Sequence, residues 1–189
     1  FGFLILRSGV LQANSALNCS SEYRINTTLP TGAVWEMCWE HRQAEGIVFH
    51  DVYYTPVGGV RRKVLAQANV AQIHVPYDDN GARFHDLSDY GLGDTRMNAL
   101  TPADCPGGQL LAHAGKNVLC AQVEARGYAY KYYAEQLQGY QLSLFSVSHI
   151  GQYNYIQIWR FADNGAIEPS IGATGALQRL AYGAAEHGW

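Results

Sequence analysis

Short runs of β-branched and aromatic residues, each bounded by turn-forming residues, are the feature of this sequence that most constrains its fold. Val, Ile, Tyr, Phe and Trp cluster in these runs, and Gly, Pro, Asn and Asp separate them. Such runs are typical of β-strands, and no stretch combines helical periodicity with capping residues. Strands are predicted at 34–41, 46–55, 61–77, 118–136, 139–150 and 153–161. Long loops are expected across 78–117.

This pattern predicts an all-β fold, an antiparallel β-sandwich. Thirteen tyrosines and four tryptophans suit a sandwich whose sheets pack aromatic faces together. The segment "ADNGA" at 162–166 predicts a tight primed hairpin turn, because Asn and Gly readily adopt the positive φ angles that such a turn needs. The strand at 153–161 is therefore expected to fold back onto a strand that starts near Ala166.

Length and charge exclude several classes of protein. A chain of 189 residues with 48% hydrophobic residues can form one domain with a sizeable core. The net charge is -3, and no basic run is longer than "RRK" at 61–63, so we expect no nucleic-acid partner and no anionic-membrane partner. The apolar stretch near the start is interrupted by Arg7 and Ser8 and is too short for a membrane span.

Cysteine usage points to an oxidising compartment. None of the cysteines has the C-x-x-C spacing of a zinc site or a redox motif, so two disulfides are expected. The four cysteines are Cys19, Cys38, Cys105 and Cys120. Asn18 in "NCS" and Asn26 in "NTT" both fit the N-glycosylation pattern. Together these features predict a secreted protein or one in the secretory pathway.

Two stretches before residue 95 hold residues that can carry chemistry. In "ARFHDLSDYGLGD" (82–94), Asp86 lies between Phe84 and Leu87. Burial in an apolar pocket would raise its pKa and make it a proton acceptor, whereas the alternative is a loop or cap residue without a chemical role. In "IHVPYDDNG" (73–81), Tyr77 follows a strand end and, taken alone, is a packed residue at the rim.

A third stretch, "SHIGQYNYIQIW" (148–159), carries two closely spaced tyrosines after a glycine. Alternation along a strand would place His149, Gly151, Tyr153 and Tyr155 on one face. Gly151 would then leave open space beside Tyr153. Without further information this arrangement indicates an aromatic ladder and not a site.

Four segments, taken in order, resemble the catalytic domain of the copper-containing primary-amine oxidases. That family has a "G-[IL]-V-x-H-[DN]-V-x-Y" strand pair, a "V-P-Y-x-D" strand end, a "D-x-G-[DE]-Y-x-x-G" segment and a quinone-forming "T-x-x-N-Y-[DE]-Y". The corresponding segments here are "GIVFHDVYY", "VPYDD", "DLSDYGLG" and "HIGQYNY". The resemblance covers roughly residues 34–183, which implies a lead-in at 1–33 and a partial catalytic domain at 34–189.

The resemblance assigns roles to four residues. In the family, the first tyrosine of the last motif is oxidised by bound copper and oxygen to topaquinone, which reacts with a primary amine. That position is Tyr153 here, and the hydroxyl of Tyr77 would hydrogen-bond the quinone. Asp86 would be the base that removes the substrate's α-proton, and Phe84 would gate the amine channel.

The resemblance also implies the disulfides and the freedom of the quinone ring. Cys105 and Cys120 would pair and close a loop of about 15 residues, which stabilises by roughly 3 kcal/mol in the chain-entropy estimate. Cys19 and Cys38 are also taken as disulfide-bonded. Gly151 would give the oxidised Tyr153 ring room to swing, and Tyr155 would brace the same face.

The chain departs from the family pattern at several positions. Gln152 replaces an Asn, Asn154 replaces an acid, His149 replaces a Thr, and Ser88 replaces a Gly. The family's copper is held by a His-x-His pair and a third histidine, all beyond the quinone tyrosine. The seven histidines here form no His-x-His, and they are His41, His50, His74, His85, His113, His149 and His187. No metal ligand is therefore assigned, although His149 could in principle serve as one.

These departures leave more than one function open. The resemblance implies oxidative deamination of primary amines by O2 to aldehyde, ammonia and hydrogen peroxide, in a homodimer, with copper and topaquinone as cofactors. Because the sequence ends at Trp189, we expect a fragment of the domain, with the activity belonging to the intact domain. The alternatives are a non-catalytic secreted β-sandwich used for binding or assembly and a chain completed by a partner that supplies the histidines.

Overall fold

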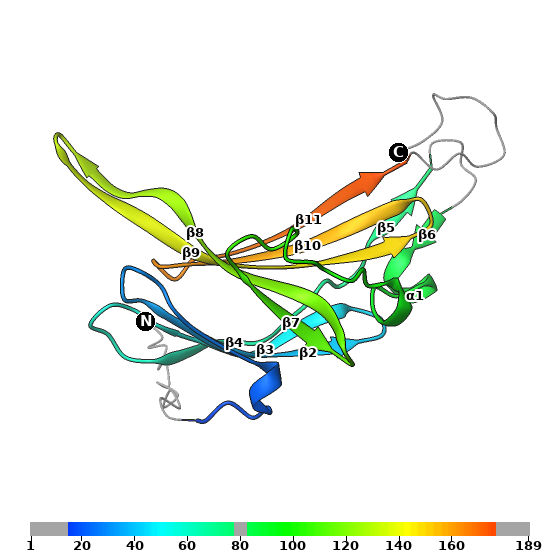
Figure 1. The fold of residues 1–189 in the computed structure, drawn as a ribbon, viewed down its shortest axis with the longest axis horizontal. Coiled ribbons are helices and arrows are strands. Elements are labelled where there is room, and N and C mark those ends of the chain that lie inside the picture. The colour runs from blue at the N-terminus through cyan, green and yellow to red at the C-terminus, as the bar shows by residue number, and fades with distance from the viewer. Residues whose placement is uncertain (1–14, 78–82, 177–189) are drawn as a thin grey trace, which may run out of the picture.

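The computed structural model describes residues 15–77 and 83–176. Its strands form two large antiparallel sheets and one small one (Figure 1). The first sheet has the order β1-β2-β3-β4, with β1 (Arg24–Thr28), β2 (Val34–Arg42), β3 (Gly46–Thr55) and β4 (Arg62–Ala68). The second has the order β11-β10-β9-β8-β7, with β7 (Gln109–His113), β8 (Lys116–Tyr132), β9 (Glu135–Ile150), β10 (Tyr153–Ala162) and β11 (Ile167–Gly175).

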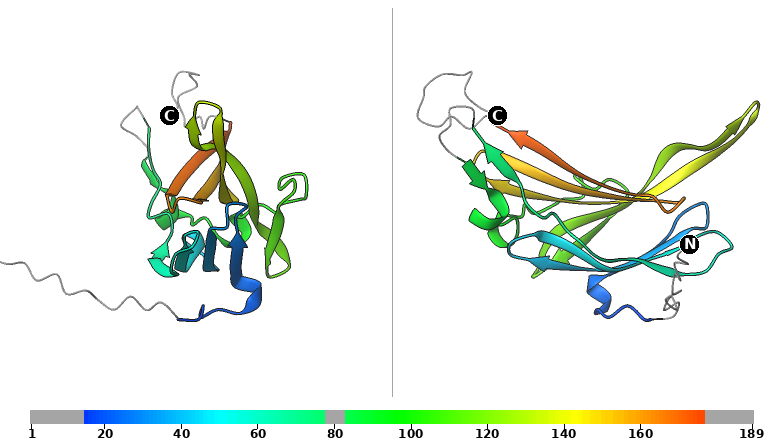
Figure 2. Two further views of the ribbon diagram at one scale, coloured as in Figure 1. Left: turned by 90° about the vertical axis from the view of Figure 1, so that its left-hand side faces the viewer. Right: turned by 180° about the vertical axis from the view of Figure 1, so that it is seen from behind.

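The two large sheets form the two layers of a sandwich, so the predicted all-β antiparallel fold is confirmed (Figures 1 and 2). Their facing sides enclose one main core, which is rich in aromatic rings as expected. Its largest fully buried members include Trp35, Trp39, Phe49, Phe161, Leu142 and Leu144. Burial of these side chains is the main term that holds the layers together.

Hydrogen bonds also join the two layers. The Trp35 indole Nε1 donates to the carbonyl of Ala162 at 3.0 Å, and the Tyr54 hydroxyl donates to the carbonyl of Asp163 at 2.6 Å. Both acceptors lie where β10 leaves its sheet, in the turn to β11. That turn is the predicted hairpin at 162–166, but only Gly165 has a positive φ, +87°, so Asn164 does not take the conformation of a primed turn.

The predicted strand at 61–77 is two strands, and the predicted loop at 78–117 contains regular structure. β4 ends at Ala68, and β5 (His74–Pro76) pairs instead with β6 (Arg83–His85) in the small sheet. The helical turns α1 (Asp86–Asp89) and η2 (Asp94–Arg96) follow, and η1 (Ser21–Tyr23) precedes β1. β5, β6 and α1 lie at the end of the sandwich where the two sheets diverge (Figure 1). Strands of three residues are too short to show an alternating pattern.

Both disulfides are present with the implied pairing. Cys19–Cys38 ties the segment before β1 to β2, and Cys105–Cys120 ties the loop before β7 to β8. β1 pairs with β2 along its whole length, so residues 24–28 belong to the first sheet although they precede the expected domain start at 34. The division into 1–33 and 34–189 stays a prediction.

The β8–β9 hairpin extends beyond the rest of the sandwich (Figure 2). Its outer part exposes a group of large side chains, which we call the hairpin arm, formed by Tyr128, Tyr130, Tyr132, Tyr133 and Leu137. Each of them is at least 49% exposed. No helix in the described part of the chain has the length and apolar character needed to cross a membrane.

Candidate active site

One cavity brings the four assigned site residues together. Its volume is about 290 Å³, and it lies where the small sheet and α1 pack against the end of the β9–β10 hairpin. The lining side chains come from these elements and from η2. They include Val75, Tyr77, Phe84, Asp86, Tyr90, Arg96, Tyr153 and Tyr155. Tyr77, Phe84 and Asp86 therefore converge on Tyr153 from a segment about 70 residues earlier in the chain.

The turn between β9 and β10 sets the direction of Tyr153. Gly151 and Gln152 form a two-residue hairpin turn, and Gly151 has the positive φ, +61°, that a type II′ turn requires at its first central position. Tyr153 is therefore the first residue of β10 and pairs with Ile150 of β9. Gly151 is therefore needed for the backbone conformation of this turn.

This turn overturns the prediction that His149 and Tyr153 share a face. Directly paired residues of an antiparallel sheet lie on the same face, and His149 pairs with Asn154, not with Tyr153. His149 is exposed on the opposite face, where its Nδ1 lies 3.2 Å from the Asn154 side-chain oxygen. It cannot act on the Tyr153 ring from there.

The hydroxyls of Tyr77 and Tyr153 meet in the buried part of the cavity. Their oxygens are 3.3 Å apart, and the two residues are 6% and 8% exposed. Burial, followed by the hydrogen bond with Tyr153, raises the pKa of Tyr77, so its hydroxyl stays protonated and can donate a hydrogen bond. The assigned role of Tyr77 toward a quinone stays a prediction.

Asp86 is the buried acid of the cavity. It is the first residue of α1 and is only 3% exposed. Burial is the largest cause that raises its pKa, and Asp89 raises it further, whereas Tyr155 and Arg96 lower it. A carboxylate that is disfavoured in this way has increased proton affinity, as a general base requires.

Tyr155 lies beside Asp86. Burial and then Asp86 raise the pKa of the Tyr155 hydroxyl, yet this hydroxyl has no partner at hydrogen-bond distance and angle within the described ranges. Asp86 and Tyr155 are therefore electrostatic neighbours, and their side chains do not form a hydrogen bond within the usual limits of distance and angle. Tyr153 and Tyr155 share one face of β10, with ring centroids 6.3 Å apart.

Aromatic rings form one wall of the cavity. The Phe84 ring stands perpendicular to Tyr77, with centroids 6.0 Å apart, and lies 6.1 Å from the Tyr90 ring. Phe84 is only partly buried. It therefore lies at the boundary between the cavity and solvent, which is where a gate residue would have to lie.

Glycines near α1 allow the Asp86 segment to pack closely on the first sheet. A Cβ atom at Gly91 would lie 2.4 Å from the Gln43 carbonyl oxygen, and one at Gly93 would lie 2.3 Å from that of Arg42. Backbone hydrogen bonds to the β2–β3 turn from Leu92 and Gly93, at 2.8 and 3.0 Å, hold this contact. The spacing "YGLG" therefore fixes α1, and with it Asp86, against the sandwich.

Two of the residues that differ from the family pattern have structural partners. Asn154 accepts a hydrogen bond from the Asn98 side chain at 3.1 Å through its own side-chain oxygen. Ser88 accepts one from the Gln72 side chain at 2.8 Å. Nearby, Asp89 accepts a hydrogen bond from the His85 backbone N–H at 2.7 Å, which ties together the two ends of α1.

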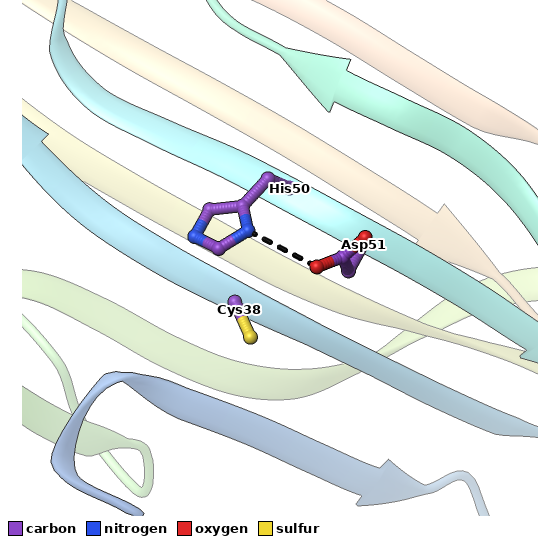
Figure 3. Close-up of side chains that lie close together, drawn as sticks. All are labelled: Cys38, His50 and Asp51. Atoms are coloured by element: carbon purple, nitrogen blue, oxygen red, sulfur yellow. Dashed lines mark hydrogen bonds and ion pairs between the residues drawn. The ribbon is translucent and has the colours of Figure 1, made fainter. Parts of the chain in front are cut away.

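The described residues do not fit a copper ion. One group of three possible ligands has its ligand atoms within 4.8 Å of one another, namely Cys38, His50 and Asp51 (Figure 3). The Cys38 sulfur is bonded to Cys19 and is therefore not a thiolate ligand. The remaining pair, with His50 Nδ1 at 3.4 Å from Asp51 Oδ2, is not the imidazole-rich set that copper prefers. We assign no step to copper.

Sequence reasoning missed one charged residue of the cavity. Arg96, at the end of η2, lines the cavity, and its guanidinium carbon lies 5.2 Å from the centroid of the Tyr90 ring. No motif contains Arg96, because it follows Gly93 by three residues in a segment without periodicity. The sequence offered one signal for Arg96: it is a cationic residue that directly follows a motif whose own residues line the cavity.

The fold is an antiparallel β-sandwich domain with one cavity that holds a buried acid and two paired tyrosines, and comparison with known proteins specifies its family. Residues 31–189 match the model of the copper amine oxidase enzyme domain. The chain belongs to the copper amine oxidase family. The family predicted from the motif resemblance and the β-sandwich predicted from the strand pattern are therefore both confirmed.

Individual relatives are distant and longer. A primary amine oxidase of Arthrobacter is 23% identical over 187 residues, which cover 81% of this chain and 29% of that protein. A peroxisomal primary amine oxidase of Pichia angusta is 28% identical over 195 residues, covering 84% and 28%. The chain thus spans about a quarter of the length of such relatives. A crystal structure of Pichia pastoris lysyl oxidase PPLO superposes with a TM-score of 0.62 at 18% identity, covering 82% of this chain and 23% of that one, and supports the fold.

Proposed function

We propose that the domain to which this chain belongs oxidises primary amines to aldehydes with O2, releasing ammonia and hydrogen peroxide. The observation that carries this proposal is the convergence of Asp86 and the Tyr77–Tyr153 hydroxyl pair on one cavity. Membership of the family supports an oxidoreductase, and the cavity supports a small organic substrate.

In this proposal the chain's own residues bind the amine and move a proton. Asp86, whose pKa is raised mainly by burial, accepts the proton from the carbon next to the amine nitrogen. The Tyr77 hydroxyl lies 3.3 Å from the Tyr153 hydroxyl, and it would donate a hydrogen bond to the oxygen of an oxidised ring there and hold that ring. A quinone formed at Tyr153 would accept the two electrons removed from the amine. Phe84 and Tyr90, with ring centroids 6.1 Å apart, form the aromatic wall against which the ligand would pack.

The test is aerobic incubation with Cu(II), carried out on the 189-residue chain and on the whole product of its reading frame. Redox-cycling quinone staining and mass spectrometry of the peptide that contains Tyr153 are the measurements. We expect quinone at Tyr153 in the whole product and none in its Tyr153→Phe variant. An unmodified Tyr153 in the whole product would refute the proposal.

A second candidate function is favoured by the absence of a copper-ligand set from the described residues. In that case the chain is a non-catalytic domain that uses the same cavity to bind a small molecule. Ligand binding without quinone formation in either protein would support this function. The two candidates therefore differ in the chemical state of Tyr153 and not in the fold.

We propose in addition that the domain forms a homodimer through the hairpin arm. The arm presents four tyrosines and a leucine that are largely exposed. Contiguous exposed apolar patches mark interaction sites, and tyrosine is enriched at interfaces. The identical arm of a second copy offers matching chemistry for this contact.

A secretory location is also proposed. Both disulfides are formed, and the acceptor asparagines Asn18 and Asn26 are exposed. Treatment of protein from its native source with an N-glycosidase should lower its mass. Unchanged mass, together with free thiols in the untreated protein, would contradict this location.

A further inference from the structure

Arg96 is a half-buried cation without an acceptor. Within residues 15–77 and 83–176, no carboxylate or carbonyl lies within hydrogen-bond or ion-pair distance of its guanidinium, whose contact is the Tyr90 ring at 5.2 Å. Two other half-buried arginines, Arg61 and Arg126, are each paired with a carboxylate, Glu36 at 2.6 Å and Asp163 at 2.7 Å. A guanidinium has five donors and no acceptor capacity, so Arg96 has unused donors that face the cavity.

The charges of the cavity also fit a ligand with two charged ends. Asp86 and Arg96 interact electrostatically, since Arg96 opposes the rise of the Asp86 pKa, yet the two side chains form no ion pair. Phe84 and Tyr90 line the same cavity and supply an aromatic wall. A volume of about 290 Å³ has room for one small ring with a substituent at each end.

We propose that Arg96 binds a carboxylate of the ligand, and that the primary amine taken by this cavity carries that carboxylate at the end opposite its amine. The guanidinium fork matches a carboxylate in a bidentate manner, and the Tyr90 ring holds the fork in place. The amine end faces Asp86. That half of the inference rests on the proposed function, whereas the carboxylate half rests on Arg96 alone.

Three matched ligands test the two halves separately. They are 4-(aminomethyl)benzoate with both groups, 4-methylbenzylamine with the amine only, and 4-methylbenzoate with the carboxylate only. Isothermal titration calorimetry measures their affinities for the unaltered 189-residue chain, for Arg96→Gln and for Arg96→Lys. Arg160→Gln is the matched control, because Arg160 lies on β10 with an exposed partner, Glu168, outside the cavity.

We expect 4-(aminomethyl)benzoate to bind most tightly. Arg96→Gln should weaken both carboxylate ligands about tenfold or more and leave 4-methylbenzylamine unchanged, whereas Arg160→Gln should change none. Arg96→Lys keeps the charge without the fork and should give an intermediate loss, which keeps the test valid if Arg96→Gln fails to fold.

The outcomes distinguish this inference from the proposed function. Carboxylate ligands that fail to bind, or whose affinity does not depend on Arg96, overturn the Arg96 site. Binding of 4-methylbenzoate that depends on Arg96, without any binding of 4-methylbenzylamine, confirms the carboxylate site and counts against an amine substrate. Loss of binding in Arg160→Gln as well would show a general effect of charge and also overturn the assignment.

Discussion

The hydroxyl oxygens of Tyr77 and Tyr153 lie 3.3 Å apart in a buried cavity, although 76 residues separate the two tyrosines in the chain. This contact predicts an energetic coupling that a double-mutant cycle can isolate. Tyr77→Phe, Tyr153→Phe and the double variant, compared by urea unfolding, should give a coupling of about 0.5–1.5 kcal/mol. The exposed pair Tyr130→Phe and Tyr132→Phe is the control and should give none. Independent effects at Tyr77 and Tyr153 would contradict the hydrogen bond.

Asp86→Asn should make the fold more stable near neutral pH. The folded-state pKa of Asp86 is raised, chiefly by burial, so the folded protein binds this proton more tightly than the unfolded chain does. Ionised Asp86 therefore destabilises the fold above its folded pKa. The penalty falls as pH drops through the raised folded pKa and vanishes only below the ordinary value of 3.8, where both states are protonated. Its size is about 1.4 kcal/mol for each pKa unit of the shift.

Thermal unfolding from about pH 3 to pH 7.5 measures this effect. The melting temperature of Asp86→Asn should exceed that of the unaltered protein at pH 7.5, and the two should converge at about pH 3. Glu168→Gln, at an exposed position on β11, should run parallel to the unaltered protein. A stability gain that does not change with pH would show that the amide acts by another route than removal of a buried charge.

The same substitution separates binding from proton transfer in a protein that carries the quinone. An amide cannot accept a proton, so Asp86→Asn should still bind the amine but reduce the cofactor far more slowly. Anaerobic single-turnover absorbance is the measurement. Cofactor reduction at the parental rate would remove Asp86 from the role of base.

Strands β2 and β3 could be predicted from the sequence, whereas the predicted strand at 118–136 runs through the turn that separates β8, which ends at Tyr132, from β9, which begins at Glu135. β2 and β3 were found within one residue of their bounds, since nine or ten residues of buried and half-buried character give a clear signal. β5 and β6 have three residues each and give no such signal. They are recognised as strands only because they pair with each other in the structure. The cavity lies beside this small sheet, so its location depended on the motif resemblance.

The face of each residue near the β9–β10 turn could not be predicted from alternation. A strand pattern assumes that the chain continues, whereas Gly151 reverses it and moves His149 to the face opposite Tyr153. Because side chains alternate along a strand, an error of one residue in the position of a turn reverses the predicted face of every residue on one side of it. The place of Arg96 in the cavity wall was equally hidden, because only tertiary structure brings this residue next to Asp86 and Tyr153.

A comparison of two buried tryptophans can measure how much one hydrogen bond between the sheets contributes to the free energy of unfolding. Trp35 and Trp39 are both 0% exposed, but Nε1 of Trp35 donates to the Ala162 carbonyl, whereas Nε1 of Trp39 has no partner in the described part. Replacement by Phe removes a similar volume at each site. Trp35→Phe should therefore destabilise by about 1 kcal/mol more than Trp39→Phe in urea unfolding. Equal losses would show that the bond adds nothing.

The two disulfides should protect different parts of the chain. Removal of Cys105–Cys120 by paired Ala substitutions opens a closed loop with a sequence separation of 15 residues, and should cost about 3 kcal/mol in the chain-entropy estimate. Limited proteolysis should then cut first between 98 and 108. Removal of Cys19–Cys38 is the matched variant and should expose the segment before β1 instead. First cleavage in the β9–β10 hairpin in both variants would contradict this division.

The hairpin arm predicts where self-association can be weakened without loss of the fold. Tyr132 and Tyr133 are 60% and 82% exposed near the end of the β8–β9 hairpin, so their replacement by Ser removes little packing within one chain. Burial against a second copy would stabilise a dimer by about 25 cal/mol for each Å² of apolar surface. The double variant should weaken dimerisation at least about tenfold in sedimentation equilibrium, at an unchanged melting temperature. Val57→Ser with Val60→Ser, at 63% and 72% exposure on the β3–β4 turn, controls for the loss of exposed apolar surface elsewhere. A monomeric unaltered protein, or equal weakening in this control, would contradict an arm-mediated dimer.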